Sequence, residues 1–416
     1  MIESNRLCRI MIKDMKTRIS KLNIDFDFEA YWEIIYLILL AFFVGMRFLL
    51  STMFTIYWPK YFYRTLTVIG VVLVLLHLMM AKDISKKEIA AMLVVTFVFM
   101  MSHYVSRYDF LVDLLILILG AYRVNFRNIL KTYIAVWSVL LVGTIIGAMT
   151  GLAENLVYYQ GERIRIALGI CYPTDLAAYV AFLMFAYVCV RNEHISKLEM
   201  VIMLILAIGV FYITDARTDF AVMLLLLACV FIIVNFPEKS INLLEAKWLK
   251  TVLIFFPIFM CLLIWMLTSF YNDNSVNLVR LNESFLSNRL LLGKQGIDDY
   301  GISFFGNYVI EVGYGGRTDW PGMYYFLDSS FISIGIKYGI VFLALMIFMM
   351  VKHIIRLQKE KEYIWEIVII ILILQCFMEH HFIQYWYNPF LMLIFSKIIK
   401  EDKKENKLAE IIDLNL

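Results

Sequence analysis

The segment KLEMVIMLILAIGVFYITDARTDFAVMLLLLACVFIIVN, residues 197–235, decides the fold of this chain. It contains two apolar runs, over 198–214 and 219–235, and each approaches the roughly 20 residues that an α-helix needs to cross a bilayer. Only the polar turn Asp215-Ala-Arg-Thr-Asp219 connects the runs. Because so short a turn joins antiparallel neighbours, the segment predicts a hairpin of two membrane-spanning helices.

The same pattern repeats in both directions from this hairpin. Hydrophobic residues make up 62% of the 416 residues, charged residues only 18%, and the mean hydropathy is +0.76. Such a chain has too little polar surface for a soluble domain, so we expect an all-α, polytopic integral membrane protein of about 12 transmembrane helices. The expected spans are 30–50, 65–81, 88–102, 108–122, 131–150, 174–190, 198–214, 219–235, 251–269, 328–351, 364–379 and 385–399.

The distribution of Lys and Arg predicts the orientation of these spans. With the N-terminus in the cytoplasm, 26 of the 38 basic residues fall on the cytoplasmic side and 10 on the outer side. This asymmetry follows the positive-inside rule, so we expect both termini in the cytoplasm. The expected parts of the chain are a cytoplasmic amphipathic segment 1–29 (or, alternatively, a disordered tail), helices 1–9 over 30–269, a large extracytoplasmic loop 270–327, helices 10–12 over 328–399, and a cytoplasmic tail 400–416.

Composition also argues against several classes of protein. The formal net charge of +3 provides no general attraction for nucleic acid. The six cysteines are scattered and show no CxxC spacing, which argues against a disulfide framework or a thiolate metal site. The chain shows no internal repeat.

The 270–327 loop has a distinctive composition. It holds 8 of the 19 glycines and 12 aromatic residues. Aromatic rings suit the C–H faces of sugars, and glycine lets a loop fold back onto a membrane surface. An aromatic belt at the membrane interface is the alternative. The loop has 6 acidic residues against 4 basic ones, so any anion site must be built from specific residues.

Four arginines on the predicted outer side lie in short polar stretches near the membrane boundary: Arg163, Arg165, Arg217 and Arg289. Arg presents a planar fork of donors to phosphate oxygens and stays charged at any working pH. Arginines from separate loops that converge on a lipid diphosphate would hold it and stabilise it as a leaving group. The alternative is that each arginine pairs with Asp, Glu or lipid headgroups, as the neighbouring Asp215 and Asp219 suggest for Arg217.

Several short motifs follow one another over residues 130–392, near the ends of predicted helices. They are Arg165 to Gly169 followed by Pro173, the turn Ala216-Arg217-Thr218, Arg289 followed by Phe304-Phe305-Gly306, Asp328-Ser-Ser-Phe331 followed by Tyr338-Gly339, then Glu379, and Asn388-Pro389. In type and order they resemble the motifs of the Wzy-type O-antigen and capsular polysaccharide polymerases, a family related to the O-antigen ligases. The chain departs from that pattern at Ala216, where Ser is usual, and at Tyr172, where His is frequent.

The resemblance implies a metal-independent glycosyltransferase of GT-C-like architecture, without a cofactor, in the cytoplasmic membrane of a bacterium. Its donor would be a glycan chain linked to undecaprenyl diphosphate. Its acceptor would be a second lipid-linked repeat unit at the outer face of the membrane, in the assembly of capsule, exopolysaccharide or O-antigen. A chain-length regulator is a further implied partner.

Such a transfer needs a group that deprotonates the acceptor hydroxyl. Candidates on the predicted outer side are Asp328, Glu311, Glu379, His380 and His381. The resemblance adds Tyr338 as a candidate substrate-binding residue, and we expect no metal site. A polar helix cap is the alternative for the two histidines. Lys337 is an intramembrane charge for which Asp113 is a candidate partner.

Two other functions compete with the polymerase. An O-antigen-type ligase would use the same donor with a different acceptor, and the sequence barely separates the two. A lipid-linked oligosaccharide flippase is a transporter, which should show internal repeats and a charged cavity at mid-membrane depth. The sequence shows neither feature, since its polar residues gather on the predicted outer side.

Overall fold

The computed structural model describes residues 28–56, 60–319 and 322–398, so nearly all of the predicted segment 1–29 and the predicted tail 400–416 lie outside the described residues. Within the described residues, nine helices are long and apolar enough to cross a membrane, as expected of an all-α, multi-pass membrane protein. These are α2 (Phe28–Leu50), α3 (Lys60–Met80), α4 (Lys86–Ser106), α6 (Phe126–Met149), α7 (Pro173–Arg191), α8 (Lys197–Thr214), α9 (Arg217–Asn235), α11 (Lys247–Ser269) and α15 (Ile340–Glu360).

The other elements are shorter. Two of them, α5 (Phe110–Gly120) and α16 (Tyr363–Met378), are apolar but have only 11 and 16 residues. The rest are α10 (Pro237–Glu245), α12 (Val276–Ser284), α13 (Arg289–Tyr300), α14 (Ser330–Lys337), the 3-10 helices η1 (Asn192–His194), η2 (His381–Ile383) and η3 (Pro389–Ile394), and the strands β1 (Val157–Gln160) and β2 (Arg163–Ile166).

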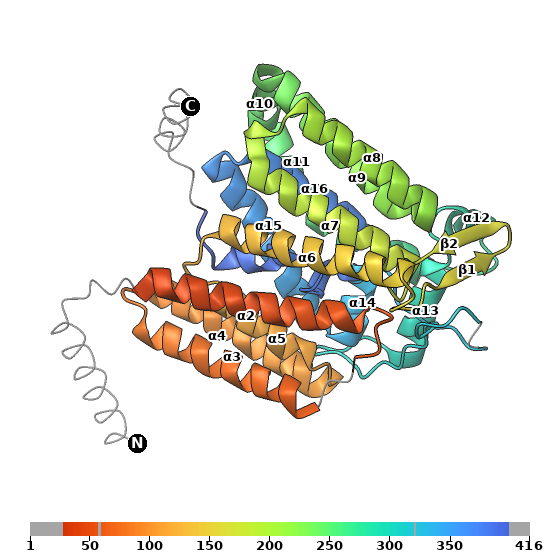
Figure 1. Ribbon diagram of the computed structural model, residues 1–416, viewed down its shortest axis with the longest axis horizontal. Helices are drawn as coiled ribbons and strands as arrows, with labels where there is room; N and C mark the ends of the chain where they lie inside the picture. The colour runs from red at the N-terminus through yellow and green to blue at the C-terminus, as the bar shows by residue number, and fades with distance from the viewer. Residues whose placement is uncertain (1–27, 57–59, 320–321, 399–416) are drawn as a thin grey trace.

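The long helices lie side by side, and the β-hairpin projects from one end of the bundle (Figure 1). α2 packs on α6, α6 on α7, α7 on α8 and α8 on α9, and α16 packs against both α9 and α7. Apolar side chains remain exposed on the outer faces of the bundle, among them Phe97, Val139 and Ile205. A surface of this kind suits contact with lipid rather than with water.

The chain alternates between the two ends of the bundle. Segments that the sequence predicts to be cytoplasmic meet at one end, where Glu29 contacts Arg123 at 3.1 Å and Lys397 at 2.8 Å, and Lys361 contacts Glu245 at 3.2 Å. Segments predicted to be outside meet at the other end of the bundle. There the β-hairpin contacts the α8–α9 turn, and the 270–327 segment contacts the start of α7. The predicted grouping of the loops therefore agrees with the fold.

The expected helix over 385–399 is not formed within its described residues, 385–398. Instead, residues 379–398 return across the bundle as a buried, irregular segment in which η3 is the only helical turn of more than three residues. Irregular backbone is tolerated at membrane depth only where protein supplies its hydrogen bonds. Asn388 Nδ2 donates to the Phe382 carbonyl at 2.6 Å, and Arg356 Nη1 donates to the Leu393 carbonyl at 2.9 Å. The apolar run therefore crosses the bundle as expected, but as irregular chain buried in protein and not as the expected helix.

The expected span 328–351 is broken into α14 and α15. Gly339 separates them with a φ of +95°, in the left-handed region that favours glycine. The 270–327 segment packs its backbone against this break, where the Ile340 N–H donates to the Ser303 carbonyl at 3.0 Å. A Cβ on Gly339 or on Gly306 would collide with the opposing backbone. Two glycines thus allow the loop and the helix break to interlock.

Asp113 and Lys337 each form an ion pair inside the bundle, but not with each other as expected. Arg47 of α2 pairs with Asp113 of α5 at 3.1 Å. Lys337 pairs with Glu311 at 2.5 Å rather than with Asp113. Charges taken out of water in a membrane bundle require partners, and the fold supplies them from distant segments.

We predict that Gly339→Ala destabilises the protein by at least about 2 kcal/mol, because the new Cβ strains a left-handed residue and collides with the backbone of the 303–306 segment. Gly209→Ala is the matched control, since a Cβ there meets nothing within 4 Å in the interior of α8. Thermal unfolding in detergent measures the stability of both variants. Equal melting temperatures for the two variants would contradict the interlock.

Candidate functional site

A cavity of about 550 Å³ opens at the end of the bundle that carries the β-hairpin. Its walls come from the hairpin, the start of α7, the α8–α9 turn, the start of α13, the segment around 313–328 and the chain that follows α16. Seven of the ten candidate residues named from the sequence line this cavity: Arg163, Arg165, Arg217, Arg289, Asp328, Glu379 and His380. The fold therefore brings together residues that are far apart in the sequence.

The hairpin places two of the arginines. β1 and β2 pair antiparallel, with Tyr158 opposite Arg165. Side chains two positions apart on a strand point to the same face, so Arg163 and Arg165 share one face, while Ile164 points away and is 58% exposed. Gly161, with a φ of +62°, makes the tight turn between the strands.

The α8–α9 turn meets this face of the hairpin. Asp215 ends α8 in a left-handed conformation, and its carboxylate accepts a hydrogen bond from Arg163 Nε. Arg165 Nε donates to the Thr214 carbonyl at 2.8 Å. Arg217 begins α9, lies 3.6 Å from the Asp215 carboxylate, and has a side chain that is 70% exposed. We call Arg163, Arg165 and Arg217 the arginine cluster.

The arginine cluster carries more positive charge than Asp215 neutralises. Burial lowers the pKa of Arg165, and the neighbouring charge of Arg163 lowers it further. Burial raises the pKa of Asp215, but the hydrogen bond and charge of Arg163 outweigh this and hold the pKa below its ordinary value. The N-terminus of α9 adds unpaired N–H groups and the positive end of the helix dipole. This part of the cavity suits an anion such as a phosphate.

Arg289 has a different environment from the arginine cluster. Its Nη2 lies 3.0 Å from Glu379 and 3.9 Å from Asp328, and its other donors bond to the carbonyls of Met378 and Leu286. Only 9% of its side chain is exposed. For Arg289 the contacts therefore favour the alternative that we set against phosphate binding, namely pairing with acidic residues. It positions Asp328 and Glu379 on the cavity wall.

The acidic cluster, which we define as Asp219, Asp328 and Glu379, lies around Arg289. Asp219 is buried and accepts a hydrogen bond from Gln375 Nε2 at 2.7 Å. Burial raises the pKa of Glu379, and the charge of Arg289 opposes that rise. Burial likewise raises the pKa of Asp328, to about 6, against the charge of Arg289. A carboxylate with a pKa close to neutrality is suited to accept a proton at physiological pH.

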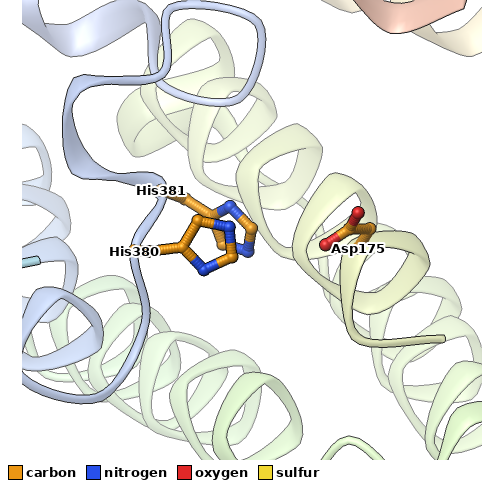
Figure 2. A group of neighbouring side chains, drawn as sticks. All are labelled: Asp175, His380 and His381. Carbon is orange, nitrogen blue, oxygen red and sulfur yellow. The ribbon is translucent and has the colours of Figure 1, made fainter. Parts of the chain in front are cut away.

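His380 and His381 follow the acidic cluster in the chain, and Asp175 of α7 lies across from their rings (Figure 2). One nitrogen of each ring and one Asp175 oxygen lie within 4.8 Å of one another. His381 Nδ1 is 3.0 Å from Gln384 Oε1, and His380 Nδ1 is 3.9 Å from Asp328. Burial lowers the pKa of His380, and the neighbouring His381 adds to this. Two neutral imidazoles and a carboxylate could hold a divalent cation such as Zn²⁺.

Three candidate residues, Glu311, Tyr338 and His381, do not line the cavity. His381 lies beside His380, which does line it. Glu311 and Tyr338 surround Lys337 instead: Glu311 pairs with the ammonium group of Lys337, and Lys337 Nζ lies 4.9 Å from the ring centre of Tyr108 and 5.7 Å from that of Tyr338. Cation–π and ionic contacts of this kind stabilise a buried ammonium group. Their contacts therefore anchor the 270–327 segment to the bundle.

Several residues of the cavity could not be predicted from the sequence. Asp215 and Asp219 were visible in the turn that holds Arg217, but only as its neighbours. Asp175, in the first turn of α7, carried no motif that would link it to histidines two hundred positions away. Tyr158 was equally without a signal, and Tyr172 was noted only as a departure from the family pattern, since only the hairpin and the helix start bring these residues to the cavity.

Comparison of the chain with protein-family models, with curated proteins and with solved structures finds no match. The class of protein is therefore defined by the fold and the site alone. It is a multi-pass helical membrane protein with a polar cavity at one end of its bundle, in which an arginine cluster and an acidic cluster line the same space.

We predict that Arg289→Met lowers the free energy of unfolding by about 3–5 kcal/mol, because it leaves two buried carboxylates without their partner. Arg217→Met should change it by less than about 1 kcal/mol, because that side chain is largely exposed. Denaturant or thermal unfolding in detergent, followed by tryptophan fluorescence, makes the comparison. If Arg289→Met lowers the free energy of unfolding as little as Arg217→Met does, the ion pairs of Arg289 do not stabilise the fold.

Proposed function

We propose that this protein is a polysaccharide polymerase, a GT-C-like glycosyltransferase that moves an undecaprenyl-diphosphate-linked glycan chain onto a second lipid-linked repeat unit. The observation that carries the proposal is the charge arrangement in the cavity. An arginine cluster and an acidic cluster, in which burial raises the pKa values of Asp328 and Glu379, line one space at the end of an apolar bundle. Transfer from a diphosphate to a hydroxyl needs both kinds of group.

The arginine cluster is the proposed site of the donor diphosphate. Arg165 and Arg163 come from the hairpin and Arg217 from the start of α9, so their guanidinium groups approach from two elements. Guanidinium groups supply bidentate, charge-assisted hydrogen bonds to phosphate oxygens. Negative charge builds up on the diphosphate as the glycosidic bond breaks, so a preorganised cationic site favours the transition state.

The acidic cluster is the proposed site of the base. In the reaction the acceptor hydroxyl oxygen forms a bond to the anomeric carbon of the donor sugar and gives its proton to Asp328 or Glu379. The bond between that carbon and the diphosphate oxygen breaks, and undecaprenyl diphosphate leaves with the electron pair. Arg289 holds both carboxylates in place, and His380, 3.9 Å from Asp328, can relay the proton.

The membrane setting supports a lipid-linked substrate. The cavity lies at one end of the bundle, where a diphosphate at the bilayer surface could reach it while its lipid chain stays beside the exposed apolar helices. The asymmetry of Lys and Arg supports the placement of this end on the outer side, with both termini inside. The membrane in this proposal is the bacterial cytoplasmic membrane. Capsule, exopolysaccharide and O-antigen synthesis all use such substrates.

An O-antigen-type ligase is the nearest alternative, because it uses the same donor chemistry. A flippase fits less well. Its binding site should lie at mid-membrane depth between related halves, whereas this cavity is built at one end from loops and helix termini.

We predict that purified native protein lengthens lipid-linked repeat units, and that Arg165→Lys and Arg217→Lys each slow this reaction about 10- to 100-fold, since Lys keeps the charge but loses the bidentate fork. Arg280→Lys is the matched control, an exposed arginine of the 270–327 segment outside the cavity. Gel analysis of the glycan products measures chain length.

The same assay separates the rivals. Transfer to a different lipid acceptor without lengthening would identify a ligase, and movement across a vesicle bilayer without lengthening would identify a flippase. Normal polymerisation by both Lys variants would end the proposal that the arginine cluster binds the diphosphate.

We predict that polymerisation continues at an unchanged rate after exhaustive treatment with EDTA, because the arginine cluster supplies the stabilisation that a divalent cation would otherwise give. Rate measurements before and after chelation test this. A different result would assign a metal to Asp175, His380 and His381. In that case EDTA would abolish activity, Zn²⁺ or Mn²⁺ would restore it in the native protein, and neither ion would restore it in the Asp175→Asn variant.

A further inference from the structure

Aromatic side chains form one wall of the cavity. Four tyrosines from three separate parts of the chain line it: Tyr158 of β1, Tyr172 at the start of α7, and Tyr314 and Tyr324 of the 270–327 segment. Neighbouring rings in this set are in contact. The ring centres of Tyr172 and Tyr158 are 6.2 Å apart, those of Tyr158 and Tyr314 are 5.7 Å apart, and those of Tyr314 and Tyr324 are 5.7 Å apart. We call these four residues the tyrosine wall.

The tyrosine wall connects the two charged parts of the cavity. At one end, Tyr158 is paired across the hairpin with Arg165 of the arginine cluster. At the other end, Tyr324 is close enough to Asp328 and Arg289 to interact with their charges. A ligand that lies along the wall therefore extends from the phosphate-binding part to the acidic part.

Hydrogen bonds hold the wall in place. The Tyr172 hydroxyl accepts a hydrogen bond from the Gly315 N–H at 2.6 Å, which fastens the loop beside Tyr314 to the start of α7. The Tyr158 hydroxyl donates to the Cys171 carbonyl at 2.6 Å. Within the wall Tyr158 is buried, whereas the other three tyrosines are half-buried. The rings are thus positioned before any ligand arrives.

A diphosphate alone does not account for such a wall. Phosphate oxygens need donors and positive charge, which the arginine cluster provides, and they gain little from aromatic rings. A sugar ring presents an apolar C–H face and a rim of hydroxyls, and tyrosine offers a flat apolar face with a polar tip. The cavity, at about 550 Å³, is in the range of about 300–1,000 Å³ typical of sites for drug-sized ligands, enough for a diphosphate with a sugar attached.

We propose that the tyrosine wall is a glycan subsite, which binds the sugar attached to the diphosphate between the arginine cluster and the acidic cluster. This proposal rests on the proposed function and deepens it. The diphosphate at the arginine cluster and the sugar along Tyr314 and Tyr324 would place the anomeric carbon between the leaving group and the base. Because stacking reads the ring face rather than individual hydroxyls, this subsite should accept several hexoses.

The test compares two probes on the purified full-length protein. The first is undecaprenyl diphosphate, and the second is undecaprenyl diphosphate carrying one sugar, prepared separately with glucose, galactose and N-acetylglucosamine. The readout is the ratio of the two dissociation constants, measured in detergent for each protein. This ratio isolates the contribution of the sugar, even if a variant also weakens binding of the diphosphate.

The native protein should bind at least one sugar-bearing probe more tightly than undecaprenyl diphosphate. Tyr314→Ala should reduce this preference about tenfold, whereas Tyr314→Phe, which keeps the ring, should retain it. Tyr159→Ala is the matched control, since Tyr159 neighbours Tyr158 on β1 but is 72% exposed and outside the cavity. Arg165→Gln should weaken the binding of both probes by a similar factor.

Two different failures can be told apart. If the native protein binds undecaprenyl diphosphate but no sugar strengthens binding, or if Tyr314→Ala and Tyr324→Ala leave the preference unchanged, the glycan subsite is wrong and the proposed function stands. If the native protein binds neither probe, the proposed function fails, and the subsite fails with it.

Discussion

The ion pair between Arg289 and Glu379 joins two parts of the chain that lie 90 positions apart in the sequence. Arg289 begins α13 in the 270–327 segment, and Glu379 follows the end of α16. The backbone of Glu379 is held as well, because its carbonyl accepts hydrogen bonds from both the N–H and the hydroxyl of Ser330 at the start of α14. A buried charge is tolerated only when it is paired, so this contact holds α13, α14 and α16 at the base of the cavity.

The cavity depends on the Arg289–Glu379 pair because this pair keeps the acidic residues of the cavity apart from the arginine cluster. Arg289 neutralises part of the acidic cluster, while the arginine cluster lies on the hairpin and the α8–α9 turn with Asp215 as its main counter-ion. Both groups are partly removed from water, so their fields act more strongly on a bound ligand than they would at an exposed surface. The tyrosine wall occupies the space between them.

Long apolar runs were the most predictable part of the fold. The hairpin of 198–214 and 219–235 appears as α8 and α9, within two residues at each end. The run at 385–399 was misleading, because a segment buried in a helical bundle is as apolar as one that faces lipid. The break at Gly339 was equally hidden, since it depends on a backbone from residues 303–306 that only the folded chain brings there.

What the sequence by itself determined is the class of the protein, the approximate positions of most helices, which loops share an end of the bundle, and a set of arginines and acidic residues as candidates for the site. These follow from local composition, since the bilayer selects apolar runs and the distribution of Lys and Arg orients them. Only the tertiary structure decided which charges pair, that Glu311 and Tyr338 lie outside the cavity, and that four tyrosines form one of its walls. Those outcomes depend on contacts between residues far apart in the chain, and neither spacing nor composition encodes such contacts.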